Sequence, residues 1–291
     1  MDRVNHSLLK KIPLRGLWRL TAARLFAVTT TAAEASNQAI LEGERFHPVQ
    51  GTQGMVATSH TLASEVALQV LKNDGNAIDA AVTAGFALAV TQPRSGNIGG
   101  GGFLLYAPGD GSAPEAIDYR ETAPAAATET MFQDEDGNVV NERSRFSHKA
   151  AGVPGTVAGL AMALERHGTL SLKEALAPAI RLAREGFVVP HRFTEGLEQA
   201  RDRLQRWPAT RDTFYKEDGS APQPGETFRQ PELAATLQRI ADQGIEGFYQ
   251  GETARLIVEE MQRGEGLITL EDLASYQPAV RQPVQGNYRG Y

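Results

Sequence analysis

Apolar residues recur at helical spacing in two neighbouring segments of the chain. In the first, Leu62, Val66 and Val70 fall on one face and predict a helix that ends at Gly75 in a left-handed cap. The second segment, AIDAAVTAGFALAVTQP, is dominated by small residues. It predicts a helix that packs very closely on its neighbours and stops before Pro93.

Short apolar runs bounded by turn residues predict strands. Residues 55–57 (MVA) and 103–106 (FLLY) have this pattern, and residues 116–121 (AIDYRE) alternate apolar with polar side chains. The polar segment APGDGSAP joins the last two runs, so we expect a β-hairpin. In its second strand, Asp118 and Arg120 face the same side, because side chains alternate along a strand.

The rest of the chain predicts mainly helices. The pairs Ser171–Glu174 and Thr269–Asp272 match the capping box that begins a helix. Further helical patterns lie at residues 156–168, 231–244 and 251–264. Residues 190–230 are mixed and charged, with Trp207-Pro208 and EDGSAPQPGE marking loops, and residues 279–291 read as extended chain.

The composition excludes several classes of function. The net charge is -6 and no basic block is present, so the chain lacks the electrostatic footprint of a nucleic-acid-binding protein. There is no Cys, which removes thiol catalysis and thiolate ligands. None of the six His residues pairs at the i,i+4 spacing of a helical metal site, and no Gly-x-Ser-x-Gly elbow occurs. We therefore expect neither a metal nor a cofactor.

The first 35 residues differ from the others. Basic residues, among them Lys10, Lys11, Arg15, Arg19 and Arg24, precede the uncharged stretch LFAVTTTAA, whose last residue begins Ala33-Glu34-Ala35. This order is typical of a secretory signal cleaved before Ser36, with a disordered basic leader as the alternative. We expect a periplasmic or secreted protein without a membrane span, since no run approaches the ~20 apolar residues that cross a bilayer.

Five glycines fall within residues 96–102, inside SGNIGGGGFLLY. A phosphate-binding loop would need a strand before it, a helix after it and usually a Lys. Here a helix precedes, a strand-like run follows, and the only local cation is Arg94. The pattern therefore favours a tight turn between a helix and a strand.

Arg120 is the candidate functional residue of the hairpin. Its planar guanidinium suits bidentate binding of a substrate carboxylate. An internal ion pair with Asp118 or Glu121 is the alternative. The strand pattern alone leaves both interpretations open.

A series of segments, in order from about Phe46 to Tyr291, resembles the γ-glutamyltransferase family, specifically the large-subunit part of its precursor. The segments include GNAIDAAVTAGFALAVTQP, GNIGGGGF, AIDYRETAP, GVPGTVAGLAMALERHG and GLITLEDLASYQPAVRQPVQGNYRGY. The resemblance implies an α+β N-terminal-nucleophile hydrolase, a four-layer αββα sandwich. Residues 36–291 would form an incomplete, large-subunit portion of it.

The resemblance also implies a chemistry. In this family a Thr at the start of the small subunit attacks the γ-glutamyl amide of glutathione, and a γ-glutamyl-enzyme ester passes to water or to an amino-acid or peptide acceptor. Arg120 matches the family's arginine that binds the glutamyl α-carboxylate. No position matches the nucleophile, so we expect that Thr beyond Tyr291. The chain would then be truncated, inactive alone, and completed by the small subunit of the same precursor.

Three alternatives stay open. A glutaryl-type β-lactam acylase or a γ-polyglutamate-processing relative would use a similar scaffold and an acyl group with a distal carboxylate, so Arg120 cannot separate them. A non-catalytic scaffold homologue would have lost the nucleophile segment.

Overall fold

The computed structural model describes residues 51–290, and the chain from Gly54 onward forms one compact unit. Its helices are α2 (Thr61–Lys72), α3 (Ala77–Thr91), α4 (Asn141–Phe146), α5 (Thr156–His167), α6 (Leu172–Glu185), α7 (His191–Leu204), α8 (Pro208–Phe214), α9 (Pro231–Gln243), α10 (Glu246–Tyr249), α11 (Gly251–Arg263) and α12 (Leu270–Ser275). The strands are β1 (Phe103–Tyr106), β2 (Glu115–Asp118), β3 (Phe187–Val188), β4 (Thr227–Phe228) and β5 (Ala279–Arg281). The unit is therefore α+β, as predicted.

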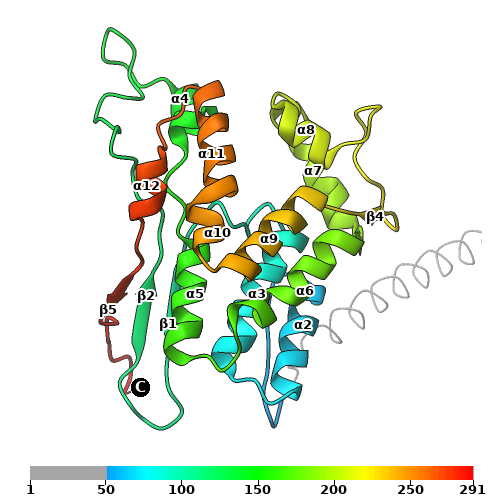
Figure 1. The fold of residues 1–291 in the computed structure, drawn as a ribbon, viewed down its shortest axis with the longest axis vertical. Coiled ribbons are helices and arrows are strands. Elements are labelled where there is room, and N and C mark those ends of the chain that lie inside the picture. Colours follow the sequence, from blue (N-terminus) through cyan, green and yellow to red (C-terminus); the bar gives the residue numbers. More distant parts are fainter. Residues whose placement is uncertain (1–50, 291) are drawn as a thin grey trace, which may run out of the picture. The chain divides into compact units, whose positions relative to one another are not determined.

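The larger sheet has the order β1-β2-β5, with both pairs antiparallel (Figure 1). The β1–β2 pair is the predicted hairpin, and β5 adds the C-terminal segment to its other edge. Leu104 and Ile117 lie on the inner face and join the core beside α5. On the outer face, Phe103 and Leu105 are 65% and 69% exposed. One face of the sheet is therefore packed, and the other presents apolar side chains.

A helical layer packs against this sheet. Helix α3 packs against both α2 and α6, and α6 packs on α9. Figure 1 shows these helices beside the sheet. Phe86 of α3 is fully buried, and such burial contributes about 1.5–3 kcal/mol. A Cβ added at Gly85 would lie 3.0 Å from Leu160 of α5. The prediction that small residues bring this helix close to its neighbours is confirmed.

Side-chain caps begin several helices as predicted. Ser171 with Glu174, and Thr269 with Asp272, form complete capping boxes at α6 and α12. At α2 the predicted cap is wrong by one position, because the left-handed residue is Asp74 (φ 63°). Gly75 is needed there for another reason: its Cβ would approach the Val70 carbonyl oxygen to 2.9 Å.

One further prediction is wrong, and one region contains helices that were not predicted. Residues 55–57 form no strand and pair with no other described segment; Met55 is 57% exposed, so its apolar character marks no buried strand. In residues 190–230 the marked segment EDGSAPQPGE is a loop between α8 and β4, but the stretch also contains α7 and α8, which its mixed, charged pattern does not predict. Their side chains bury around a small separate cluster of Leu197, Tyr215 and Ala221. Local charge obscured this tertiary packing.

Candidate substrate-binding site

The segment of residues 119–122 follows β2 directly and carries Arg120. The strand ends at Asp118, so Arg120 lies beyond it rather than within it as predicted. Tyr119 and Gly102 exchange two backbone hydrogen bonds of 2.9 and 3.2 Å. The Arg120 N–H donates to Oδ1 of Asp118 (3.1 Å). Arg120 is thus held by its backbone just where the strand stops.

The glycine-rich loop fits closely against this segment. A Cβ at Gly101 would lie 2.4 Å from the Tyr119 carbonyl oxygen and 2.9 Å from the Arg120 Cα. The Gly100 carbonyl accepts hydrogen bonds from the N–H groups of Gly155 and Thr156 (2.8 and 3.0 Å). These glycines therefore allow close backbone packing, which confirms the predicted tight turn.

The opposite side of the segment is held by residues before α5. Thr122 and Val153 exchange backbone hydrogen bonds of 2.8 and 3.3 Å. A Cβ at Gly152 would come within 2.8 Å of the Glu121 Cβ, so a larger residue would displace the segment. The glycine loop and residues 152–153 together enclose the backbone on which Arg120 stands.

The Arg120 side chain is far less constrained than its backbone. It is 63% exposed, and its Nε lies 3.3 Å from Oε2 of Glu121. That buried carboxylate oxygen has no hydrogen-bond partner within the described residues. Of the two ion pairs considered from the sequence, the one with Glu121 is present at this distance. Asp118 pairs instead with Arg281 of β5, whose Nε lies 2.6 Å from Oδ2.

The electrostatics keep this end of the strand charged. The hydrogen bond from the Arg120 N–H, followed by that from Arg281, lowers the pKa of Asp118. Burial raises the pKa of Tyr276 to about 12, and the charges of Asp118 and Glu121 add to the shift. The Tyr276 hydroxyl is therefore protonated at neutral pH and donates to the Arg120 carbonyl oxygen at 2.8 Å.

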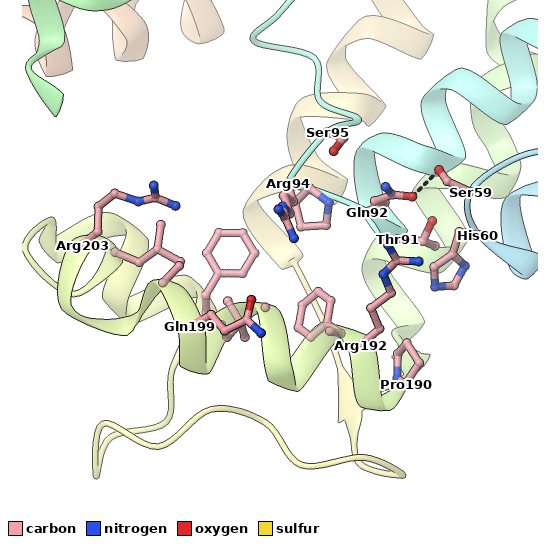
Figure 2. A pocket seen from close by; sticks show the side chains of 17 residues that line it. Ser59, His60, Thr91, Gln92, Arg94, Ser95, Pro190, Arg192, Gln199 and Arg203 are labelled. Carbon is pink, nitrogen blue, oxygen red and sulfur yellow. Dashed lines mark hydrogen bonds between the residues drawn. The ribbon is translucent and has the colours of Figure 1, made fainter. Parts of the chain in front are cut away.

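One cavity borders the Arg120 segment, and another lies apart from it. The smaller, of about 380 Å³, adjoins the Arg120 segment and includes Thr122, Asp272 and Tyr276 in its lining. The larger, of about 760 Å³, lies between the end of α3 and helix α7, and Figure 2 shows Arg192 reaching from α7 toward Thr91. Arg120 does not line this larger cavity. The sequence does not indicate this cavity, because the mixed, charged pattern of residues 190–206 predicts no regular element there.

The threonines that could be taken for nucleophiles have structural roles instead. Thr269 Oγ1 donates to Oδ2 of Asp272 in its capping box, and Thr156 opens α5 at the glycine loop. Within residues 51–290, no group of three His, Asp or Glu side chains could hold a metal ion. Nor does that part of the chain contain a helix long and apolar enough to cross a membrane.

Comparison with known proteins identifies the family. The family model described as gamma-glutamyltranspeptidase matches residues 63–291. The chain belongs to the γ-glutamyltranspeptidase family. It is 46% identical over 252 residues to a glutathione hydrolase proenzyme of Escherichia coli (strain K12), covering 86% of this chain and 43% of that relative.

Other relatives extend the family match. The structure resembles the Helicobacter pylori gamma-glutamyltranspeptidase with a TM-score of 0.82 and 47% identity, over 84% of this chain and 70% of that one. An acylase ACY 1 proenzyme of Pseudomonas sp. (strain SE83) is 40% identical, over 84% of this chain and 44% of the relative. The predicted α+β N-terminal-nucleophile hydrolase fold is confirmed. The chain spans less than half the length of the curated relatives it matches.

Proposed function

We propose that this chain is the large-subunit portion of a γ-glutamyltransferase that cleaves the γ-glutamyl amide of glutathione. The membership of the γ-glutamyltranspeptidase family and the 46% identity to a glutathione hydrolase proenzyme support this assignment. The observation that carries it is Arg120, whose backbone is fixed on both sides while its guanidinium remains mostly exposed. A rigidly mounted, accessible arginine suits recognition of a carboxylate.

In this proposal Arg120 binds the α-carboxylate of the γ-glutamyl group. The guanidinium offers five N–H donors in a planar fork, so it can bind both carboxylate oxygens at once. Glu121 holds the guanidinium from one side at 3.3 Å, and substrate would take the remaining donors. The fixed backbone then sets where the glutamyl γ-carbon lies relative to the nucleophile.

The nucleophile comes from the remaining part of the precursor. We propose a Thr that self-processing frees at the start of the small subunit, with its own α-amine as the base. Attack on the γ-carbonyl carbon forms a γ-glutamyl ester and releases the amine of the leaving group. Water or an amino-acid or peptide acceptor then cleaves the ester. The exposed apolar pair Phe103 and Leu105 supports packing of further structure on the outer sheet face.

Expression of the complete reading frame that contains this chain tests the proposal. Denaturing electrophoresis should show two bands, and the product should hydrolyse a γ-glutamyl anilide, whereas residues 1–291 alone should not. A single uncut band without hydrolysis would support the non-catalytic scaffold alternative. A stop codon directly after Tyr291 would have the same meaning.

A second candidate is a glutaryl-type acylase. The 40% identity to the acylase ACY 1 proenzyme supports it. A glutaryl group and a γ-glutamyl group carry the same distal carboxylate, but only the latter has an α-amine. Comparing kcat/KM for glutaryl and γ-glutamyl anilides therefore separates the two. The transferase proposal expects the γ-glutamyl compound to be favoured, and a preference for the glutaryl compound would favour the acylase.

We also propose export to the periplasm or the exterior. The support is the signal-like order of residues 1–35, which lie outside the described residues. N-terminal sequencing of the secreted or periplasmic fraction should begin at Ser36. An intact N-terminus on protein recovered only from the cytoplasm would contradict export.

A further inference from the structure

Tyr276 connects the Arg120 segment to the end of α12. The tyrosine follows that helix directly, and its hydroxyl donates to the Arg120 carbonyl oxygen at 2.8 Å. The two residues are 156 positions apart in the chain. Among the described residues, this is the hydrogen bond that the Arg120 carbonyl accepts. The α12 end therefore holds the peptide group that follows the arginine.

The Tyr276 ring is itself held in place. It stacks on the Tyr249 ring with centroids 5.8 Å apart and planes at 5°. The Tyr249 hydroxyl donates to the Pro154 carbonyl (2.8 Å) and accepts from the Ala158 N–H (3.3 Å). A Cβ at Gly155 would come within 2.1 Å of the Tyr276 hydroxyl oxygen. The ring consequently sits in a slot that exists only because residue 155 is glycine.

From these contacts we infer that Tyr276 is a positioning residue for Arg120, one that fixes the angle at which the guanidinium meets the substrate carboxylate. The inference rests on the proposed function, because Arg120 is assigned there to the carboxylate. Asp118 restrains the Arg120 N–H and Tyr276 restrains its C=O, so both peptide groups around the residue are oriented. In this role Tyr276 acts through Arg120 and needs no contact with the substrate.

The expected consequence is a loss of binding rather than of chemistry. The carboxylate is bound equally in the ground state and the transition state, since no bond to it changes during acyl transfer. A misplaced guanidinium therefore raises KM and leaves kcat nearly unchanged. A residue that only supported folding would lower the amount of active enzyme, or Tm, without raising KM.

The test uses Tyr276→Phe in the complete enzyme, with a γ-glutamyl anilide as substrate. The ring and its stacking stay, and only the hydroxyl is removed. We expect KM to rise about fivefold, the equivalent of one lost hydrogen bond, with kcat within about twofold.

Tyr215→Phe is the matched control. The Tyr215 hydroxyl also donates to a backbone carbonyl, that of Leu197 at 2.7 Å, but within the separate α7–α8 cluster. Both variants should lower Tm similarly, and only Tyr276→Phe should raise KM. An unchanged KM in Tyr276→Phe, or an equal rise in both variants, would overturn the positioning role.

Arg120→Lys in the same enzyme separates this inference from the proposed function. A raised KM in Arg120→Lys with an unchanged KM in Tyr276→Phe overturns only the role of Tyr276. An unchanged KM in Arg120→Lys would show that Arg120 does not bind the carboxylate. It would then contradict both the proposed function of Arg120 and the positioning role of Tyr276.

Discussion

The two ends of β2 place charged side chains in opposite situations. At the start of the strand, Glu115 accepts hydrogen bonds from Arg166 Nε (2.8 Å) and from His167 Nε2 (2.9 Å), both on α5. The His167 ring lies 4.4 Å from that of Tyr106 on β1. The Glu115 carboxylate thus pairs with two side chains of α5, and these contacts link the hairpin to the helical layer.

At the other end of β2 the backbone of Arg120 is fixed, and its guanidinium lies 3.3 Å from the adjacent Glu121. The glycine loop, residues 152–153 and Tyr276 surround the peptide groups of Arg120, whereas its side chain is 63% exposed. On the basis of this difference we propose that Arg166 serves stability and that Arg120 binds a ligand. Hydrogen-bonded pairing with a carboxylate of another element distinguishes Arg166, and a fixed backbone with a more exposed side chain distinguishes Arg120.

The largest expected effect follows from exchanging the two arginines for alanine in turn. In the complete enzyme, Arg120→Ala should raise KM for a γ-glutamyl anilide on the order of 100-fold, since a charge-assisted pair is worth ~3 kcal/mol. Arg166→Ala should lower Tm and leave KM within about twofold. Steady-state kinetics with both variants checks this. A similar rise in KM in both would show that Arg120 and Arg166 do not differ in their role in substrate binding.

Close packing at Arg120 gives the next effect. Gly101→Ala would force a Cβ to 2.4 Å from the Tyr119 carbonyl, so we expect a loss of about 1–3 kcal/mol in the free energy of unfolding and a higher KM. Gly109→Ala in the hairpin turn is the control, because nothing lies within 4 Å of its added Cβ. Urea denaturation and kinetics of both variants are the measurements. Equal stability of the two would mean that the glycine loop does not press on the segment.

Local sequence patterns predicted most of the helices and the hairpin that surround the Arg120 segment. Capping boxes at Ser171 and Thr269 and the small residues of α3 act within a few positions, so the sequence displays them directly. The position at which β2 ends, just before Arg120, could not be predicted from the local sequence. It depends on Tyr276, 156 residues away, and on the fit of Gly101 against another segment. Likewise, α7 and α8 are stabilised by contacts that a charged local sequence conceals.

The ion pair of Glu115 at the start of β2 should make the stability of the protein depend on pH. The hydrogen bond from Arg166, above all, lowers the pKa of Glu115 to about 2 from its usual 4.5. Because the folded-state pKa is depressed, this contribution to stability is complete above about pH 4.5 and is lost as the pH falls toward 2. Glu115→Gln should flatten that part of the stability curve, measured by thermal unfolding between pH 7 and 2. An identical pH dependence in the variant would exclude Glu115 as its source.

The smallest effect concerns the exposed pair that borders Arg120. Arg281 is 63% exposed where it contacts Asp118, and such surface pairs contribute about 0–1 kcal/mol. Arg281→Gln should therefore change Tm slightly and KM by less than about threefold. A rise in KM as large as that of Arg120→Ala would show that β5 takes a direct part in the site.

The proposed role of Arg120 is to recognise the α-carboxylate of a γ-glutamyl substrate. The most direct measurement compares a γ-glutamyl anilide with a 4-aminobutanoyl anilide, which keeps the amine and lacks that carboxylate. The complete wild-type enzyme should favour the γ-glutamyl compound in kcat/KM by about 100-fold, and Arg120→Ala should reduce this preference to within about threefold. A variant that keeps the full preference would contradict the claim.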